Sequence, residues 1–219
     1  LKMQNKNDEA FDVLYKSIWN DSWQHNGFLQ LARLAAAKKD FEQALELVNK
    51  SLNRNYTSSA GRHLKSALLR HLDRTNEAIE WTRASLVIDP FNLGCLWESH
   101  LLGEPSRLSD RIRNSFNNYA EYALDYAYAG LFNEAYDLLK YYKPERDEPL
   151  LNYYLGWLKL KLNDSHNATK HFQLAASAPA DYCFPSKTEE VEILQTAIQH
   201  NDRDSKALYY LGNYWYANG

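Results

Sequence analysis

The sequence contains little cysteine, glycine or proline, and these shortages exclude several classes of protein. Only two cysteines, Cys95 and Cys183, occur among its 219 residues. They lie too far apart to form a zinc motif or a disulfide framework. They fit a reducing compartment, with the cytoplasm favoured, although two free thiols in an oxidising compartment remain an alternative. Eight glycines and six prolines leave long stretches free for helix, which favours an all-helical chain.

The chain also lacks a strong net charge and a long apolar run. Its formal net charge is −3, which gives no support to nucleic-acid binding, because a nucleic-acid-binding protein usually carries a basic stripe. No apolar run approaches the roughly 20 residues that a bilayer-spanning helix needs. We therefore expect neither nucleic acid nor a membrane among its partners.

Motifs of the common enzyme classes are missing as well. There is no G-x-G-x-x-G, P-loop, G-x-S-x-G or H-E-x-x-H pattern. His166 and His171 lie on different faces of an expected helix rather than at the i, i+4 spacing of a metal pair. Glu189, Glu190 and Glu192 lie near a helix start, where solvated carboxylates interact favourably with the helix dipole. We expect no enzymatic activity, no cofactor and no metal.

What the sequence does contain is a repeat. Ala10, Ala44 and Ala78 are spaced by 34 residues, and each lies early in a helix-like segment. A fixed period of this length indicates one helical hairpin that is repeated along the chain. The hairpins are expected to stack, because a single hairpin cannot bury its apolar face alone.

The repeat register varies in quality along the chain. We expect regular repeats over residues 1–90, a degenerate unit over 91–116 and divergent repeats over 117–219. In the last region Leu155-Gly156, Ala168 and Phe172 restore the pattern, and the glycine suits a close approach of two helices. A shorter helix is expected over 105–115. A capping box, Ser186-Lys187-Thr188-Glu189, is expected to open a helix that ends at His200.

These residues resemble the tetratricopeptide repeat (TPR) family, which has the same period and a Leu-Gly, Ala, Phe and Pro pattern. The resemblance is most specific for two units, His25–Ser58 and Ser59–Asn92. It implies an all-α fold, a right-handed superhelical solenoid of stacked antiparallel helix pairs, that extends over residues 1–219 as a single domain.

A narrower resemblance is carried by Tyr122–Leu131, Tyr182–Pro185 and Tyr209–Asn213. These segments are similar to the C-terminal repeat region of large bacterial proteins that have an N-terminal domain of unknown function. The chain begins Leu1-Lys2-Met3 and ends at Gly219, in the middle of a repeat. We interpret it as a fragment of a longer protein that exposes an apolar helix face at its C-terminal end.

The resemblance also implies a binding groove, because positions 2, 5, 9 and 12 of each first helix face the concave surface. We predict that the groove is solvent-exposed and contiguous, mildly basic in its early part and aromatic in its late part. A TPR subclass that grips a C-terminal carboxylate would need Lys at Leu29 and Asn at Arg33, so that mode is not expected. The residues predicted to line the groove are Arg33, His63, Trp97, Tyr153, Trp157, Tyr209 and Asn213.

Several functions are compatible with such a groove. Our first hypothesis is a noncatalytic protein-interaction scaffold that binds a peptide segment or a neighbouring domain, including one of the same polypeptide. The alternative is a helical accessory domain of a carbohydrate-active or other multidomain bacterial enzyme, with the aromatics stacking on sugar rings. A third hypothesis is a structural spacer or dimerisation arm. The same aromatics could instead pack helix on helix, and the oligomeric state is left open.

Overall fold

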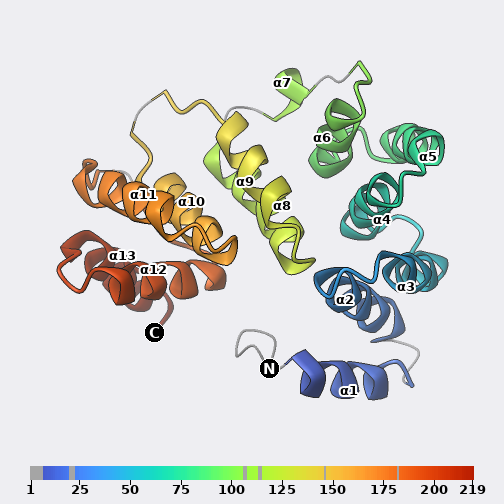
Figure 1. The fold of residues 1–219 in the computed structure, drawn as a ribbon, viewed down its shortest axis with the longest axis horizontal. Helices are drawn as coiled ribbons and strands as arrows, with labels where there is room; N and C mark the ends of the chain where they lie inside the picture. The colour runs from blue at the N-terminus through green and yellow to red at the C-terminus, as the bar shows by residue number, and fades with distance from the viewer. Residues whose placement is uncertain (1–6, 20–22, 106–107, 113–114, 146, 182) are drawn as a thin grey trace. The chain divides into compact units, whose positions relative to one another are not determined.

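Helices account for the regular structure of the chain. The computed structural model describes residues 7–19, 23–105, 108–112, 115–145, 147–181 and 183–219, and no strand occurs in these ranges (Figure 1). The chain divides into unit 1, residues 1–113 with 121–131, and unit 2, residues 114–120 with 132–219. The all-α class predicted from the sequence is confirmed.

Unit 1 begins with antiparallel helix pairs that follow one another along the chain. Its first regular pairs are α2 with α3 and α4 with α5, and α4 also packs on α3 and α6. The helices are α1 (Asn7–Ser17), α2 (Gln24–Ala37), α3 (Phe41–Arg54), α4 (Ser59–His71), α5 (Thr75–Ile88), α6 (Leu93–Leu101), α7 (Leu108–Arg111) and the second part of α8 (Phe116–Tyr128).

Unit 2 contains the first part of α8 and the helices that follow it. The pair α10 and α11 has the same antiparallel packing as the pairs of unit 1, and α12 packs on both α10 and α13. The helices are α9 (Phe132–Tyr141), α10 (Pro149–Lys161), α11 (Ser165–Ser177), α12 (Thr188–His200) and α13 (Ser205–Asn218).

The periodic alanines lie where two helices of a pair cross. Ala44, Ala78 and Ala168 expose no surface, as the period predicts, because only a small side chain fits between closely packed helices. The side chain of Ala10 lies outside the described residues. The degenerate stretch forms a shorter helix than we expected, since α7 covers only Leu108–Arg111.

The turns between paired helices also repeat. Lys39, Asp73 and Asn163 adopt left-handed backbone angles, with φ of 65°, 56° and 59°. After the first of these, the Asp40 amide donates to the Ala35 carbonyl at 3.1 Å, which closes the helix end as in a Schellman motif. Gly130 takes the same conformation, with φ of 69°, as expected for the tight turn it makes.

Carboxylate side chains cap several helices at their N-terminal ends, and only one of these caps was predicted from the sequence. Asp40 caps α3 and Asp164 caps α11 by accepting from the amides of Gln43 and Asn167. The capping box predicted for α12 is wrong by one residue. Its closing carboxylate is Glu190, which accepts from the amides of Ser186 and Lys187, and the helix ends at His200 as expected.

Glycines of the Leu-Gly repeat pattern have different surroundings in α10 and α13. A Cβ atom at Gly156 would lie 2.5 Å from the Phe172 ring, so the expected close approach of two helices is confirmed. At Gly212 nothing in the described part of the chain lies within 4 Å of such an atom. Helix α13 exposes Leu208, Trp215 and Tyr216, which confirms the apolar face predicted for the last helix.

Candidate functional site

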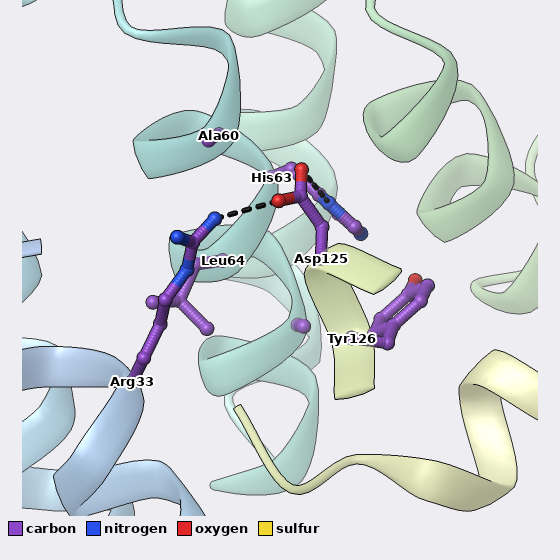
Figure 2. A pocket seen from close by; sticks show the side chains of 7 residues that line it. Arg33, Ala60, His63, Leu64, Asp125 and Tyr126 are labelled. Atoms are coloured by element: carbon purple, nitrogen blue, oxygen red, sulfur yellow. Dashed lines mark hydrogen bonds and ion pairs between the residues drawn. The ribbon is translucent and has the colours of Figure 1, made fainter. Parts of the chain in front are cut away.

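Two of the predicted groove residues meet in unit 1. Arg33 projects from α2 and His63 from α4, and both approach Asp125 of α8 (Figure 2). The Arg33 guanidinium donates to Asp125 Oδ1 at 2.6 Å, and His63 Nδ1 lies 3.9 Å from Asp125 Oδ2. Tyr126 lines the same small cavity, whose volume of about 10 Å³ suits roughly one water molecule. An acidic side chain is therefore held by two basic ones.

His63 is fixed in place by packing on several sides. Its ring is buried and meets the Tyr126 ring edge-on, with the centroids 4.4 Å apart. A Cβ atom at Gly94 of α6 would lie 2.3 Å from His63 Cγ, so only glycine leaves room for the ring. Nε2 of this imidazole is buried and has no hydrogen-bond partner among the described residues. The imidazole therefore has little freedom to move relative to Asp125.

A second carboxylate ties the same region of α8 to α4 and α6. Glu98 of α6 is fully buried and accepts two hydrogen bonds from the Arg70 guanidinium, at 2.8 and 3.1 Å. The hydroxyl of Tyr126 donates to the same carboxylate. Buried charges need such partners, because burying an uncompensated charge costs several kcal/mol. We call Arg33 and Arg70, together with the neighbouring imidazole of His63, the cationic surface of unit 1.

Further contacts join α2 to the residues that follow Tyr126. The guanidinium of Arg33 lies 5.0 Å from the centre of the Tyr128 ring, a cation–π distance. A Cβ atom at Gly130 would lie 2.8 Å from Cα of Ala37, so the two backbones approach closely at this turn. We call residues 121–131, which belong to unit 1, the docked segment.

Trp97 does not contribute an exposed ring to this surface. It is buried in α6 and stacks on His100, with the ring centroids 5.1 Å apart. The prediction that it faces solvent is therefore wrong, because α6 is too closely packed to leave the indole open.

The predicted aromatic groove of unit 2 is closed by hydrogen bonds. Tyr153 has no exposed surface, and its hydroxyl donates to both carboxylate oxygens of Asp204 at 3.0 Å. Burial, with Asp204 adding to it, raises the pKa of Tyr153. Trp157 is 7 % exposed, and its indole nitrogen donates to Glu192 at 3.3 Å. The expectation that these two rings form an exposed, contiguous groove is wrong, because carboxylates of the following helices bind them.

A buried tyrosine of α10 binds another acidic residue whose role the sequence did not indicate. The Tyr154 hydroxyl donates to Glu190 at 3.0 Å, and both side chains are buried. Our expectation of solvated carboxylates at the start of α12 is therefore wrong for Glu190. Sequence spacing does not identify the carboxylates that bind buried tyrosines, because the two partners lie tens of residues apart.

Helix α13 alone keeps predicted groove residues accessible in unit 2. Tyr209 is 55 % exposed and Asn213 is half-buried. Tyr210, the next residue along the helix, is buried, and its ring lies 5.7 Å from that of Tyr209. The described residues thus place two of the seven predicted side chains at the surface of unit 2 and bring two others together in unit 1.

The remaining reactive groups give no sign of a chemical site. Burial raises the pKa of the Cys95 and Cys183 thiols to about 12, which disfavours the nucleophilic thiolate. The described residues contain no group of three or more His, Cys, Asp or Glu side chains arranged to hold a metal ion. None of the described helices is both long enough and apolar enough to span a membrane.

Comparisons with known proteins give only distant structural neighbours. No family model matches the chain, and no curated protein matches its sequence. The crystal structure of MamA is 15% identical over 80% of this chain and 89% of its own, with a TM-score of 0.39. YrrB, described as a TPR protein with an unusual peptide-binding site, is 16% identical over 90% of this chain and 96% of its own, with a TM-score of 0.38.

These similarities are too distant to support an argument about function or partners. What defines the class of the protein is its own geometry. Helix pairs that repeat every 34 residues, with an alanine buried at each crossing and the same left-handed turn, are the features expected of TPR hairpins. The fold is TPR-like, as the sequence predicts.

Proposed function

We propose that the protein is a noncatalytic protein-interaction scaffold and that the cationic surface of unit 1 binds an acidic segment of a partner. The observation that carries this proposal is the contact of Arg33 and His63 with Asp125, a residue distant in sequence. It supports the proposal because the carboxylate that these side chains contact is presented by a helix of the same chain. Cationic side chains that are mostly withdrawn from water hold such a group more strongly than exposed ones do.

The surface suits recognition because its basic groups are held in position before a partner arrives. Packing against Gly94 of α6 limits the movement of His63, and the bidentate bond to Glu98 fixes Arg70. Side chains that are already ordered lose little entropy when they bind, which favours affinity.

A peptide library displayed on phage and selected against the full chain tests this proposal. We expect peptides to be enriched, and their binding to fall at least tenfold when Arg33→Gln is added to an Asp125→Asn chain, in which the internal carboxylate no longer competes for Arg33. The same chain with Arg203→Gln added is the matched control, because Arg203 lies in an exposed turn of unit 2. If no peptide is enriched, or if both variants bind the selected peptides as the Asp125→Asn chain does, the proposal is wrong.

The sugar-binding alternative receives no support from the contacts of unit 2. It depends on an exposed indole at Trp157, since sugar rings stack on open aromatic faces. That side chain is almost completely buried, and its nitrogen is bound to Glu192. No other observation favours an accessory role in carbohydrate chemistry.

A further inference from the structure

We propose that the docked segment, residues 121–131, occupies the partner-binding surface of unit 1, and that the partner is a helical segment with an acidic residue followed by tyrosine. The partner would replace the docked segment by repeating its contacts. This inference rests on the function proposed above and names the chemistry of the ligand.

The first argument comes from the polar contacts of two adjacent residues. Asp125 binds Arg33 and lies near His63, while the Tyr126 hydroxyl donates to Glu98. Together these contacts reach α2 and α4, which carry the cationic surface, and α6, which carries Glu98. An acidic residue followed directly by tyrosine therefore satisfies both a cationic and an anionic site of unit 1.

The second argument comes from shape. The docked segment buries the small residues Ala123 and Ala129, and at Gly130 its backbone comes close to Ala37 of α2. Glycine, which has no Cβ atom, permits this close approach. A partner is therefore expected to carry glycine four positions after its tyrosine.

The third argument is that the docked segment fits the surface imperfectly. The Asp125 carboxylate stops 3.9 Å from His63 Nδ1, beyond hydrogen-bond distance. A cavity of about 10 Å³ remains among Arg33, His63 and Tyr126. A glutamate is one methylene longer, so we expect its carboxylate to extend further toward the imidazole. A partner with glutamate before tyrosine should therefore bind more tightly than the docked segment's own sequence does.

A free peptide must compete for the cationic surface with the docked segment, which is part of the same chain. A segment of the same chain has an effective concentration that reaches the millimolar range when the linker suits the span. A free peptide of equal affinity therefore binds the parent chain weakly. Its apparent affinity rises when the tethered copy is weakened, because the fraction of chains with an open surface increases.

Fluorescence anisotropy with a labelled peptide of residues 121–131 tests the proposal on the full chain. We expect the peptide to bind an Asp125→Asn chain at least tenfold more tightly than the parent. An Asp137→Asn chain, altered at an exposed aspartate of unit 2, should bind as the parent does. A peptide with asparagine in place of its own aspartate should lose the gain, and one with glutamate there should bind at least threefold more tightly.

An Asp125→Glu chain keeps the test valid if Asp125→Asn fails to fold. Glutamate should hold the docked segment more firmly, so hydrogen exchange of residues 121–131 should slow at least threefold relative to the parent. Equal peptide binding by all folded chains, or unchanged exchange in Asp125→Glu, overturns the proposal. If selected peptides depend on Arg33 but do not compete with the 121–131 peptide, this inference fails while the scaffold function stands.

Discussion

The same repeat positions carry opposite chemistry in the two units. In unit 1 they hold the basic residues Arg33 and His63, which contact a carboxylate of the docked segment. In unit 2 they hold Tyr153 and Trp157, which donate to carboxylates of the following helices. Basic residues at these positions contact a carboxylate, and another acidic segment can form the same contact. Aromatic residues at these positions pack into the core instead.

The comparison explains why the two units should respond differently to solution conditions. The side chains of Arg33 and Asp125 are 10 % and 20 % exposed, so salt screens this pair only in part. The bond between Tyr153 and Asp204 is buried, so salt acts on it much less.

The largest expected effect comes from breaking the buried carboxylate of unit 1. Glu98→Ala leaves Arg70 without its carboxylate and the Tyr126 hydroxyl without its acceptor, which should lower the free energy of unfolding by about 3–5 kcal/mol. Urea titration measures the loss, and hydrogen exchange locates it in unit 1. Glu104→Ala is the control, because its ion pair with the exposed Arg83 should contribute about 1 kcal/mol or less. Equal losses in both variants would contradict the burial argument.

The next prediction compares three glycines that differ in what a Cβ atom added at each would contact. Gly94→Ala would force His63 aside in unit 1, and Gly156→Ala would force Phe172 aside in unit 2. Each should cost about 1–3 kcal/mol, measured by urea unfolding. Gly212→Ala meets nothing within the described residues and should stabilise α13 by about 0.5–1 kcal/mol through helix propensity.

These glycine variants also distinguish the two units by function. Only Gly94→Ala should weaken binding of peptides selected on the parent chain, because it moves a residue of the cationic surface. If Gly156→Ala weakens that binding as much as Gly94→Ala does, the assignment of the surface to unit 1 is wrong.

The sequence predicted the helix pairs well because their signals are local and periodic. The 34-residue spacing located Ala44 and Ala78 at buried crossings, and the Leu-Gly pattern located Gly156 at a close approach. Propensity and spacing depend on residues within one turn or one hairpin, so a single sequence contains enough information to find them.

Only part of the candidate site was predictable, because its other contacts join residues that are far apart in the sequence. Periodicity selected Arg33 and His63 but did not indicate Asp125, which lies in a later helix and has no spacing relation to them. Glu98 and Asp204 were missed in the same way, and without Asp204 the Tyr153 ring was expected to be exposed. Pairing across such distances is decided by how helices stack, which the repeat pattern does not encode residue by residue.

A smaller effect should appear on acidification, and it concerns unit 2. Burial lowers the pKa of His171, with Lys140 and Lys159 adding to it and Asp164 opposing it. The folded state therefore prefers the neutral imidazole, and the unfolded state takes up a proton more readily. The stabilisation is complete above the ordinary pKa of 6.5 and is lost as pH falls below that value.

Urea unfolding at pH 7.5 and 5.5 measures this dependence. The parent should be less stable at the lower pH, and His171→Gln should reduce the difference. The Tyr136 hydroxyl and Asn152 lie within hydrogen-bond distance of the imidazole, and the neutral glutamine can still bond to one of them. An unchanged pH dependence in the variant would show that other groups cause it.

The smallest expected effect compares the turns of the two units. Lys39 in unit 1 and Asn163 in unit 2 both have positive φ, which is unfavourable for most side chains but tolerated by asparagine. Lys39→Gly should therefore raise the free energy of unfolding by about 0.5–1 kcal/mol, and Asn163→Gly by less. Lys38→Gly is the matched control, because Lys38 has an ordinary φ of −82° and glycine there only adds flexibility. Thermal unfolding should rank the variants in the order Lys39→Gly, Asn163→Gly, parent and Lys38→Gly, and a gain in the last would show that backbone strain at the turn is not the cause.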